Sequence, residues 1–526
     1  MKYISILLTV LLLFSLALPA FAEDTSGCET PIIHMYGQGT VLKNAKGELV
    51  YTGELPGGGI AEGLRDLIPE FIEGWKLKPD EAWDLYYRRV RDVVLPTFGP
   101  YFLDKNGEAI DGTEPAWGWR AGAVPDRKGP NGYEMHAYDY LPDWRLDPFV
   151  NADHLYDFIQ AVKQATGSDK VNICGRCEAA NILLAYFAKY GYDDLNCVEF
   201  LASAGRGIDI VSALFSGRLH IDPDGLVRYR EQNLEIEDSL TRELVEALAV
   251  FSGDTYLLDV AGVSLDVFNL VFVNKKILVP LIRETYGTMP GIWCMVDKED
   301  YQTARRNIFG GVEEEYAGLL EKLDRYDREV RQRADELLAE AKNAGVKVAV
   351  FAKYGDYQGV PIGKHANSLS DASVNVTDAS FGATTANYGE TLPEAYLQNA
   401  EKNGTAKYIS PDKMVDASTC VLPDNTWFIW GISHLDFSPY LFQYLMKFFQ
   451  NDGEMTVFDD PSYPQYAIVE YNEEQPEQST IKPMAAENTP TVELPQRDIH
   501  NVNWKDNILR FLKAILQFLL GWIIKR

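Results

Sequence analysis

Cys177 is the residue of this chain whose surroundings most favour covalent chemistry. It lies in the sequence V-N-I-C-G-R-C-E-A-A-N-I-L-L-A-Y-F-A-K-Y-G, residues 171–191, where a short apolar run predicts a buried strand and helical spacing begins at Glu178. Gly175 and Ala179 flank Cys177 at the second residue on each side. This pattern is typical of a nucleophile elbow, a strained turn between strand and helix that lifts one reactive side chain clear of a sheet. A buried structural cysteine is the competing interpretation.

A cysteine nucleophile needs a base, and the base needs an acid that orients it. His434 is the candidate base, because it alone of the seven histidines directly follows a late predicted strand; a surface or structural histidine is the alternative. For the acid the sequence predicts Asp412, between the last two predicted strands, and leaves Asp371, Asp356 and Asp416 as competitors. The order nucleophile, acid, histidine is that of α/β hydrolases.

An oxyanion hole would complete such a site. Residues 31–35, P-I-I-H-M, predict a short buried strand that leads into the glycine-rich sequence Y-G-Q-G of residues 36–39. A loop of this kind after an early strand supplies one backbone N–H of the oxyanion hole in α/β hydrolases. The sequence therefore predicts the N–H groups of Gln38 and Glu178 as the two donors. A plain glycine turn is the alternative.

Strands and helices alternate around these residues. The predicted strands are Pro31–Met35, Tyr133–Tyr138, Val171–Cys174, Cys197–Ala202, Val346–Ala352 and Thr426–Trp430. Helical spacing covers Ala61–Trp75, Asp80–Leu95, Asn151–Ala165, Val312–Ala344 and Pro439–Phe449. Such alternation implies a mostly parallel sheet with helices on both faces. We therefore predict an α/β class protein, with an α/β-hydrolase fold in residues 23–450.

The alternation fails between about residues 205 and 311. This region holds helical patterns and the apolar run Tyr256–Val273, in which Asp259, Asp266 and Asn269 argue against a membrane span. Because the region falls between two predicted strands, we predict a helical cap or lid inserted over the elbow, which would supply an apolar acyl pocket. An ordinary helical subdomain without a substrate role is the alternative.

Both ends of the chain differ from the predicted domain. Residues 1–22 have the basic start, apolar centre and small-residue cleavage site of a signal peptide, which predicts a secreted, extracellular or cell-surface protein. Residues 451–503 are rich in Pro, Glu, Gln and Thr and predict a disordered acidic linker. Residues 504–526 predict an amphipathic helix at a membrane surface, because their polar residues share one stripe. Docking on the protein itself or on a partner is the alternative.

Composition limits the class of protein. A formal net charge of −28 over 526 residues argues against nucleic acid as a partner, because polyanions need clustered Lys and Arg. The six cysteines are too scattered for a compact disulfide framework, and no His and Cys cluster has ligand spacing, so neither a metal nor a cofactor is predicted. Cys174 and Cys177 also form a C-x-x-C, which predicts dithiol chemistry in a thioredoxin-like setting and permits a disulfide that silences the nucleophile.

Several blocks resemble one family of α/β hydrolases, the lecithin:cholesterol acyltransferase and lysosomal phospholipase A2 group. The sequence Y-D-Y-L-P-D-W-R-L at 138–146 resembles the family's Y-D-W-R-L segment, and residues 175–179 take the place of its G-H-S-x-G elbow. D-K-M-V-D-A-S at 412–418 resembles the D-x-T-V stretch that carries its acid, and G-I-S-H-L at 431–435 resembles the segment that carries its histidine. The likeness extends, with gaps, over residues 31–449.

The resemblance implies cleavage of phospholipid acyl esters at membrane surfaces and transfer of the acyl group to water, a sterol or another alcohol. It implies Cys177 as nucleophile, Asp412 as acid and His434 as base, with the N–H groups of Gln38 and Glu178 as oxyanion donors. The expected function is a secreted, membrane-associated, lipase-like acyl hydrolase or acyltransferase that forms a covalent acyl-enzyme on lipid or other carboxylic esters. A catalytically inactive surface binding protein with a hydrolase fold, or a C-x-x-C thiol-disulfide protein, is the alternative.

The chain departs from this family at the elbow. Cys177 replaces serine, Arg176 stands where histidine is usual, and Ala179 replaces the second glycine. Dienelactone hydrolases and polyhydroxyalkanoate synthases also use cysteine in this elbow. Because a thiolate is a good leaving group, the intermediate formed from an ordinary oxygen ester returns readily to reactants, which favours acyl transfer, thioesters or activated esters over plain lipolysis.

Overall fold

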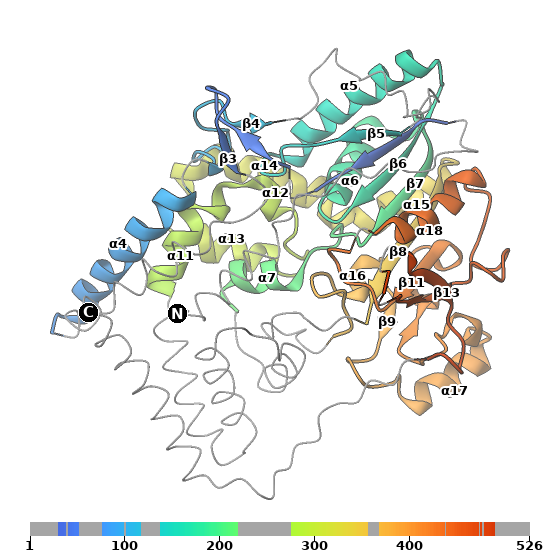
Figure 1. Cartoon of the computed structure of the whole chain (residues 1–526). Helices are drawn as coiled ribbons and strands as arrows, with labels where there is room; N and C mark the ends of the chain where they lie inside the picture. Colours follow the sequence, from blue (N-terminus) through green and yellow to red (C-terminus); the bar gives the residue numbers. More distant parts are fainter. Residues whose placement is uncertain are drawn as a thin grey trace, which may run out of the picture.

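An eight-stranded, mostly parallel β-sheet organises the molecule (Figure 1). The structure is a computed structural model that describes residues 30–37, 40–51, 76–98, 101–116, 137–218, 275–355, 368–436, 438–472, 474–475 and 478–489. In spatial order the strands are β13 (Thr480–Pro483), β12 (Tyr466–Glu470), β11 (Thr426–Trp430), β8 (Lys347–Tyr354), β7 (Leu195–Leu201), β6 (Val171–Arg176), β1 (Ile32–Met35) and β5 (Ala137–Tyr140). All neighbouring pairs are parallel except β12 with β13. The prediction of an α/β protein with a mostly parallel sheet is confirmed.

The central strands are buried along nearly their whole length because both faces of the sheet are covered. Every residue of β6 is buried, and in β8 only the first residue is partly exposed. Side chains alternate between the two faces. Ile173 therefore packs into one hydrophobic cluster, whereas the next residue, Cys174, packs into the other.

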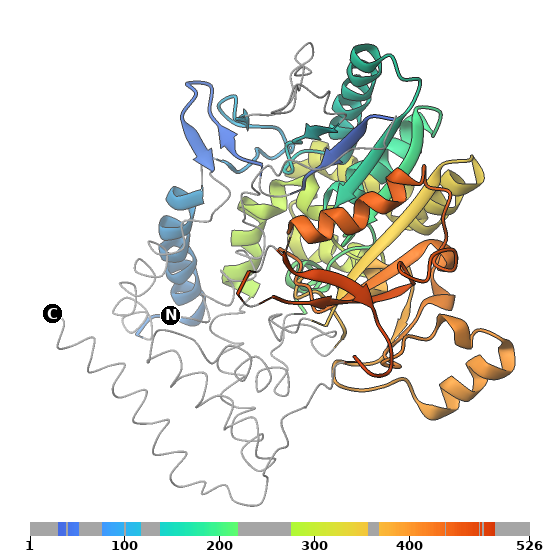
Figure 2. The same cartoon turned by 45° about the vertical axis from the view of Figure 1, so that its right-hand side comes forward.

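Helices form a layer on each side of the sheet. On one face, α5 (Pro148–Thr166), α6 (Ala179–Tyr190) and α15 (Ala334–Asn343) contribute to the larger apolar cluster. On the other face, α18 (Pro439–Gln450) packs its aromatic and aliphatic residues on the sheet, and Figure 2 shows this helix lying across the strands. The predicted arrangement of helices on both faces is thus present.

Further elements surround these layers. The other α-helices within the described residues are α4 (Pro79–Phe98), α7 (Asp209–Ser216), α11 (Lys275–Glu284), α12 (Pro290–Trp293), α13 (Tyr301–Phe309), α14 (Ala317–Glu329), α16 (Val376–Ala379) and α17 (Glu394–Asn403). Two small sheets hold β2 (Leu42–Lys43) between β3 (Leu49–Tyr51) and β4 (Glu114–Pro115), and pair β9 (Thr384–Thr385) with β10 (Val415–Asp416).

The described parts of the predicted cap region are helical. They comprise α7, α11, α12 and α13, whereas residues 219–274, including the apolar run of the predicted lid, lie outside the described residues. The helix α4 runs alongside α11 (Figure 1), and the Tyr87 hydroxyl and Arg91 Nε each lie 2.6 Å from the carboxylate of Glu284.

Two predictions from the sequence are wrong in part. Residues 451–503 were predicted to be a disordered linker, but this segment contributes β12 and β13 to the edge of the main sheet. Residues 312–344 were predicted to be one helix, but α14 and α15 are separated by a 3₁₀ turn, Arg331–Arg333. The turn lets the buried Arg331 donate to the carbonyl groups of Val296 and Trp293, at 2.8 and 2.6 Å.

The predicted signal peptide (1–22) and C-terminal amphipathic helix (504–526) lie outside the described residues, as do residues 490–503. Among the helices that the structure does describe, none combines the length and the apolar character needed to cross a membrane.

Candidate active site

The turn that carries Cys177 has the backbone of a nucleophile elbow. Cys177 connects β6 to α6 with a φ of 51°, in the left-handed region that non-glycine residues seldom adopt. Its N–H donates to the carbonyl of Leu201 at 3.0 Å, and its own carbonyl accepts from the N–H of Ala204 at 3.1 Å. These bonds hold the strained turn against the loop after β7, and the side chain remains partly exposed.

The glycine at the second residue before Cys177 is less constrained than the elbow pattern suggests. A Cβ atom on Gly175 would meet no atom of another residue closer than 3.4 Å, the distance to Leu183 Cδ2, which is ordinary contact. The conformation at Cys177 itself, not crowding at Gly175, is therefore what characterises this turn.

His434 and Asp371 form a buried pair at the same edge of the sheet. His434 lies in the loop after β11, and its ring Nδ1 is 2.7 Å from Oδ2 of Asp371 in the loop after β8. The other carboxylate oxygen of Asp371 accepts the N–H groups of Ser373 and Val374, at 3.1 and 2.8 Å. Burial raises the pKa of Asp371, but the charge of His434 and these hydrogen bonds lower it below its usual value, so the carboxyl group is ionised.

The imidazole of His434 also interacts with Cys177. Burial lowers the pKa of His434, but the negative charges of Asp371 and Cys177 and hydrogen bonds to both raise it to about 10. The structure thus brings together Cys177, His434 and Asp371, the residue types that a cysteine nucleophile, its base and an orienting acid require. At neutral pH, this arrangement favours a protonated imidazole beside the sulfur.

Asp412, the acid preferred from the sequence, does not contact His434. Its carboxylate accepts from the Tyr354 hydroxyl at 2.9 Å and from the Met414 N–H at 2.9 Å, and it also bonds to the Ser410 hydroxyl. Asp416 instead binds the Tyr396 hydroxyl at 2.8 Å and caps the turn at Ser418. The carboxylate that contacts His434 is therefore that of Asp371, which the sequence left as a competitor.

Asp356, the remaining competitor, and Gln38, the first predicted oxyanion donor, lie outside the described residues. Gly37, just before Gln38, packs directly on the elbow. A Cβ atom on Gly37 would lie 3.1 Å from Glu178 Cβ and 3.3 Å from the backbone N atoms of Glu178 and Ala179. The loop after β1 is thus close to the N–H of Glu178, the second predicted donor.

The side chain of Glu178 is fully buried beside the nucleophile. Neither carboxyl oxygen has a hydrogen-bond partner among the described residues. Burial raises the pKa of Glu178 well above its usual value, and the charges of Cys177 and Asp143 raise it further. Burial therefore favours the neutral form of this carboxyl group, which places no negative charge next to the sulfur.

Two buried cations lie near the elbow, and the sequence analysis assigned a role to neither. The guanidinium of Arg176 stacks on Phe442 and Tyr36, with its central carbon 4.1 and 4.8 Å from the ring centres. Lys353, on β8, is fully buried. A lysine near the end of the otherwise apolar sequence V-A-V-F-A-K-Y was the signal that could have identified it.

The C-x-x-C arrangement does not place its two sulfurs in a redox turn. Cys174 lies inside β6 and packs in the cluster under α18, whereas Cys177 follows the end of the strand. Three residues of extended chain span about 10 Å, which exceeds the Cα separation that a disulfide bridges. No disulfide joins any two of the five described cysteines, which are Cys174, Cys177, Cys197, Cys294 and Cys420.

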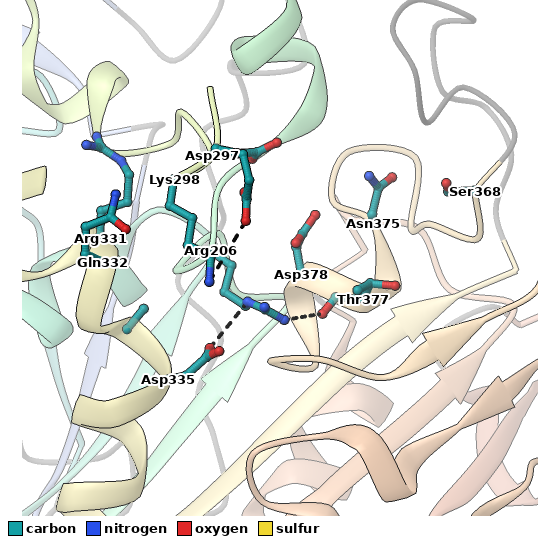
Figure 3. Close-up of a pocket in the computed structure, with 12 residues that line it drawn as sticks. Arg206, Asp297, Lys298, Arg331, Gln332, Asp335, Ser368, Asn375, Thr377 and Asp378 are labelled. Carbon is teal, nitrogen blue, oxygen red and sulfur yellow. Dashed lines mark hydrogen bonds and ion pairs between the residues drawn. The ribbon is translucent and has the colours of Figure 1, made fainter. Parts of the chain in front are cut away.

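A separate polar pocket of about 280 Å³ lies near the loop that carries Asp371 (Figure 3). Its lining includes Arg206, Lys298, Asp297 and Asp335, but none of Cys177, His434 and Asp371. Arg206 is held by Asp335 at 3.3 Å and by the carbonyl of Thr377 at 3.4 Å (Figure 3). This charged pocket is not the apolar acyl pocket predicted for the cap.

Within the described residues, no group of three or more His, Cys, Asp and Glu side chains is arranged to hold a metal ion. Comparison of the sequence with protein-family models gives no match, and a search of the curated proteins gives none either. The class of protein defined so far is therefore an α/β protein with a cysteine, histidine and aspartate at the carboxyl edge of its parallel sheet.

Proposed function

We propose that this protein is a cysteine-dependent acyl hydrolase or acyltransferase with an α/β-hydrolase fold. One observation carries the proposal: Cys177, at a strained turn between β6 and α6, interacts with a histidine that Asp371 orients. The chain order of nucleophile, acid and histidine is that of α/β hydrolases. A buried structural cysteine would need neither the left-handed turn nor a histidine and aspartate pair beside it.

The first half of the proposed reaction begins with a proton transfer from Cys177 to His434. The raised pKa of His434 favours the imidazolium that this transfer forms. The sulfur attacks the carbonyl carbon of the ester, and the carbonyl electrons move to oxygen, where the N–H of Glu178 donates a hydrogen bond. When the C–O bond breaks, the imidazolium gives its proton to the departing alkoxide, which leaves as an alcohol. A thioester on Cys177 and a neutral His434 remain.

The second half reverses these proton movements. Neutral His434 takes the proton of water or an alcohol as its oxygen attacks the thioester carbonyl, and collapse of the intermediate expels the Cys177 thiolate. The ion pair is restored. Since a thiolate leaves more readily than an alkoxide, activated esters and thioesters are the favoured acyl donors, and acyl transfer is favoured over plain lipolysis.

The proposed substrates are lipid or other carboxylic esters. This part of the proposal is supported by the resemblance to the lecithin:cholesterol acyltransferase and lysosomal phospholipase A2 group. Residues 1–22 support export to the cell surface or beyond, and residues 504–526 support attachment to a membrane surface.

Intact-protein mass spectrometry tests the central claim. The full chain is incubated with p-nitrophenyl butyrate or a short acyl thioester, with and without reductant, beside Cys177→Ala and the matched control Cys174→Ala. We expect a mass increase of one acyl group in the wild type and in Cys174→Ala, and none in Cys177→Ala. Absence of an adduct and of turnover in the reduced wild type would remove the catalytic proposal and favour a binding protein.

A further inference from the structure

Lys353 lies directly beneath the loop that carries His434. The strand β8 places its side chain at the carboxyl edge of the sheet, beside Ile429 of β11, and the side chain is fully buried. Its ammonium donates to three acceptors of the loop after β11. These are the carbonyl oxygens of Ser433, His434 and Asp436, at 3.2, 3.1 and 2.7 Å.

Three carbonyl oxygens of one loop thus match the three N–H groups of one ammonium. An ammonium is a compact charge with three donors, and hydrogen bonds to a charged group contribute more than neutral ones. The loop after β11 extends from the end of that strand at Trp430 to the start of α18 at Pro439, and its described residues belong to neither a helix nor a strand. The ammonium therefore supplies main-chain hydrogen bonds that a helix or strand would otherwise provide.

Several titratable and charged groups surround Lys353, which lies near Cys177, His434 and Asp371. Burial lowers the pKa of Lys353 to about 8. The titratable and charged groups that face it are Asp371 and Cys177 of the site, Asp436 of the loop, and Arg176 at the end of β6. At neutral pH the ammonium is mostly protonated and can hold the loop.

We propose that Lys353 is a positioning residue, which fixes the backbone of residues 433–436 and so holds the imidazole of His434 at Cys177. The proposal rests on the Cys177 and His434 pair of the proposed function. Its distinguishing consequence is that Lys353 affects Cys177 through His434, whereas a direct effect of its charge on the thiolate would not require the histidine.

A double-mutant cycle separates these two effects. The rate of Cys177 alkylation by iodoacetamide at pH 7, read by peptide mass spectrometry, is measured in the wild type, Lys353→Met, His434→Ala and the double variant. We expect Lys353→Met to slow alkylation by about tenfold in the wild-type background and by less than about twofold in the His434→Ala background, since positioning acts only through the ring. Equal factors in both backgrounds would overturn the proposal.

Lys347→Met is the matched control, because Lys347 lies at the other end of the same strand and pairs with Asp452 at the surface. It should leave alkylation unchanged. Thermal unfolding by circular dichroism checks that each variant is folded, and Lys353→Gln replaces Lys353→Met if the latter lacks a cooperative transition. If Lys353→Met and Lys353→Gln are both unfolded while Lys347→Met is folded, the proposal is contradicted, because Lys353 would then support the sheet as a whole.

The alkylation experiment uses no ester, so the two proposals fail separately. If the double-mutant cycle gives the expected factors but no acyl adduct forms, the acyl-transfer function fails and the role of Lys353 stands. If Lys353→Met alkylates like the wild type while His434→Ala does not, the role of Lys353 alone fails. Equal alkylation of the wild type and His434→Ala removes the pair on which both rest.

Discussion

His434 and Asp371 are joined twice, once through their side chains and once through their main chains. Besides the 2.7 Å contact between Nδ1 and Oδ2, the backbone N–H of His434 donates to the backbone carbonyl of Asp371, also at 2.7 Å. The second bond fixes the two loops relative to each other, so the ring and the carboxylate meet in a defined orientation. Loops after β8 and β11, 63 residues apart, are thereby joined into one unit.

The first prediction concerns the identity of the acid. Asp371→Asn removes the charge that orients and stabilises the imidazolium, so we expect acyl-enzyme formation to fall by at least about 100-fold. Asp412→Asn, the matched control, weakens a bond to Tyr354 and should leave the rate within about threefold, with a loss of stability of about 1–3 kcal/mol. Stopped-flow release of p-nitrophenol measures both rates. The opposite ranking would restore Asp412 as the acid.

The second prediction concerns pH. His434 must give a proton to a poor leaving group, so acylation by an alkyl ester should continue through pH 8–9 and fall as pH rises through about 10, its raised pKa. Acylation by p-nitrophenyl butyrate should lack this fall, since p-nitrophenolate leaves without a proton. In Asp371→Asn the fall should move to lower pH, because the largest charge that raises the pKa of His434 is gone.

The raised pKa of His434 also makes the stability of the folded protein depend on pH. His434 is protonated in both states below 6.5, its usual pKa, so its contribution to folding is complete there and is lost as pH rises through about 10. Identical pH profiles for the two esters would show that His434 is not the proton donor in acylation.

Local sequence was sufficient to predict the turn at Cys177 and the place of His434 after β11, because both depend on residues adjacent in the chain. It was not sufficient to predict which carboxylate contacts His434. Asp412 lies in a family-like sequence, but its carboxylate accepts hydrogen bonds from the Tyr354 hydroxyl and from a backbone N–H of its own turn. Asp371 reaches His434 only because β8 and β11 are neighbours in the sheet. The contacts of Lys353 could not be predicted for the same reason, since its three acceptors lie about 80 residues later in the chain.

Composition misled where short strands lie among polar residues. The segment Tyr466–Glu470 is a good strand sequence, Y-A-I-V-E, but the Pro, Glu and Gln residues around it dominated the interpretation of residues 451–503. Pairing with β11 supplies the packing and the hydrogen bonds that composition does not reveal. The prediction of one long helix over residues 312–344 was wrong for a different reason. The apolar stripe continues through the turn at Arg331, but the α-helical conformation of the backbone does not.

The third prediction compares two glycines. A Cβ atom on Gly37 would crowd Glu178 Cβ and the N atoms of Glu178 and Ala179, all within 3.1–3.3 Å. Gly37→Ala should therefore displace the oxyanion donor and slow acyl-enzyme formation by about 10- to 100-fold, with little loss of stability. Gly175→Ala is the control, since its Cβ meets nothing closer than 3.4 Å, and it should retain near wild-type rates. Equal rates in the two variants would argue against a donor at this position.

The fourth prediction concerns the buried carboxyl group of Glu178. Because its pKa is raised well above 4.5, the native state keeps a proton that the unfolded state releases as pH rises above that value. The unfolded state then binds fewer protons, so the free energy of unfolding falls with pH, by at most about 1.4 kcal/mol per pH unit from this one group. Glu178→Gln has the same shape without the titration, and it should be increasingly stable relative to the wild type between pH 4.5 and 7.5.

Urea unfolding at several pH values measures this difference, with the exposed Glu401→Gln on α17 as the control. The stability difference between Glu178→Gln and the wild type should grow with pH, whereas that of Glu401→Gln should stay constant. A constant difference for Glu178→Gln would mean that the carboxyl group is ionised in the folded protein. A negative charge would then stand beside Cys177, with the cations Arg176 and Lys353 nearby to offset it.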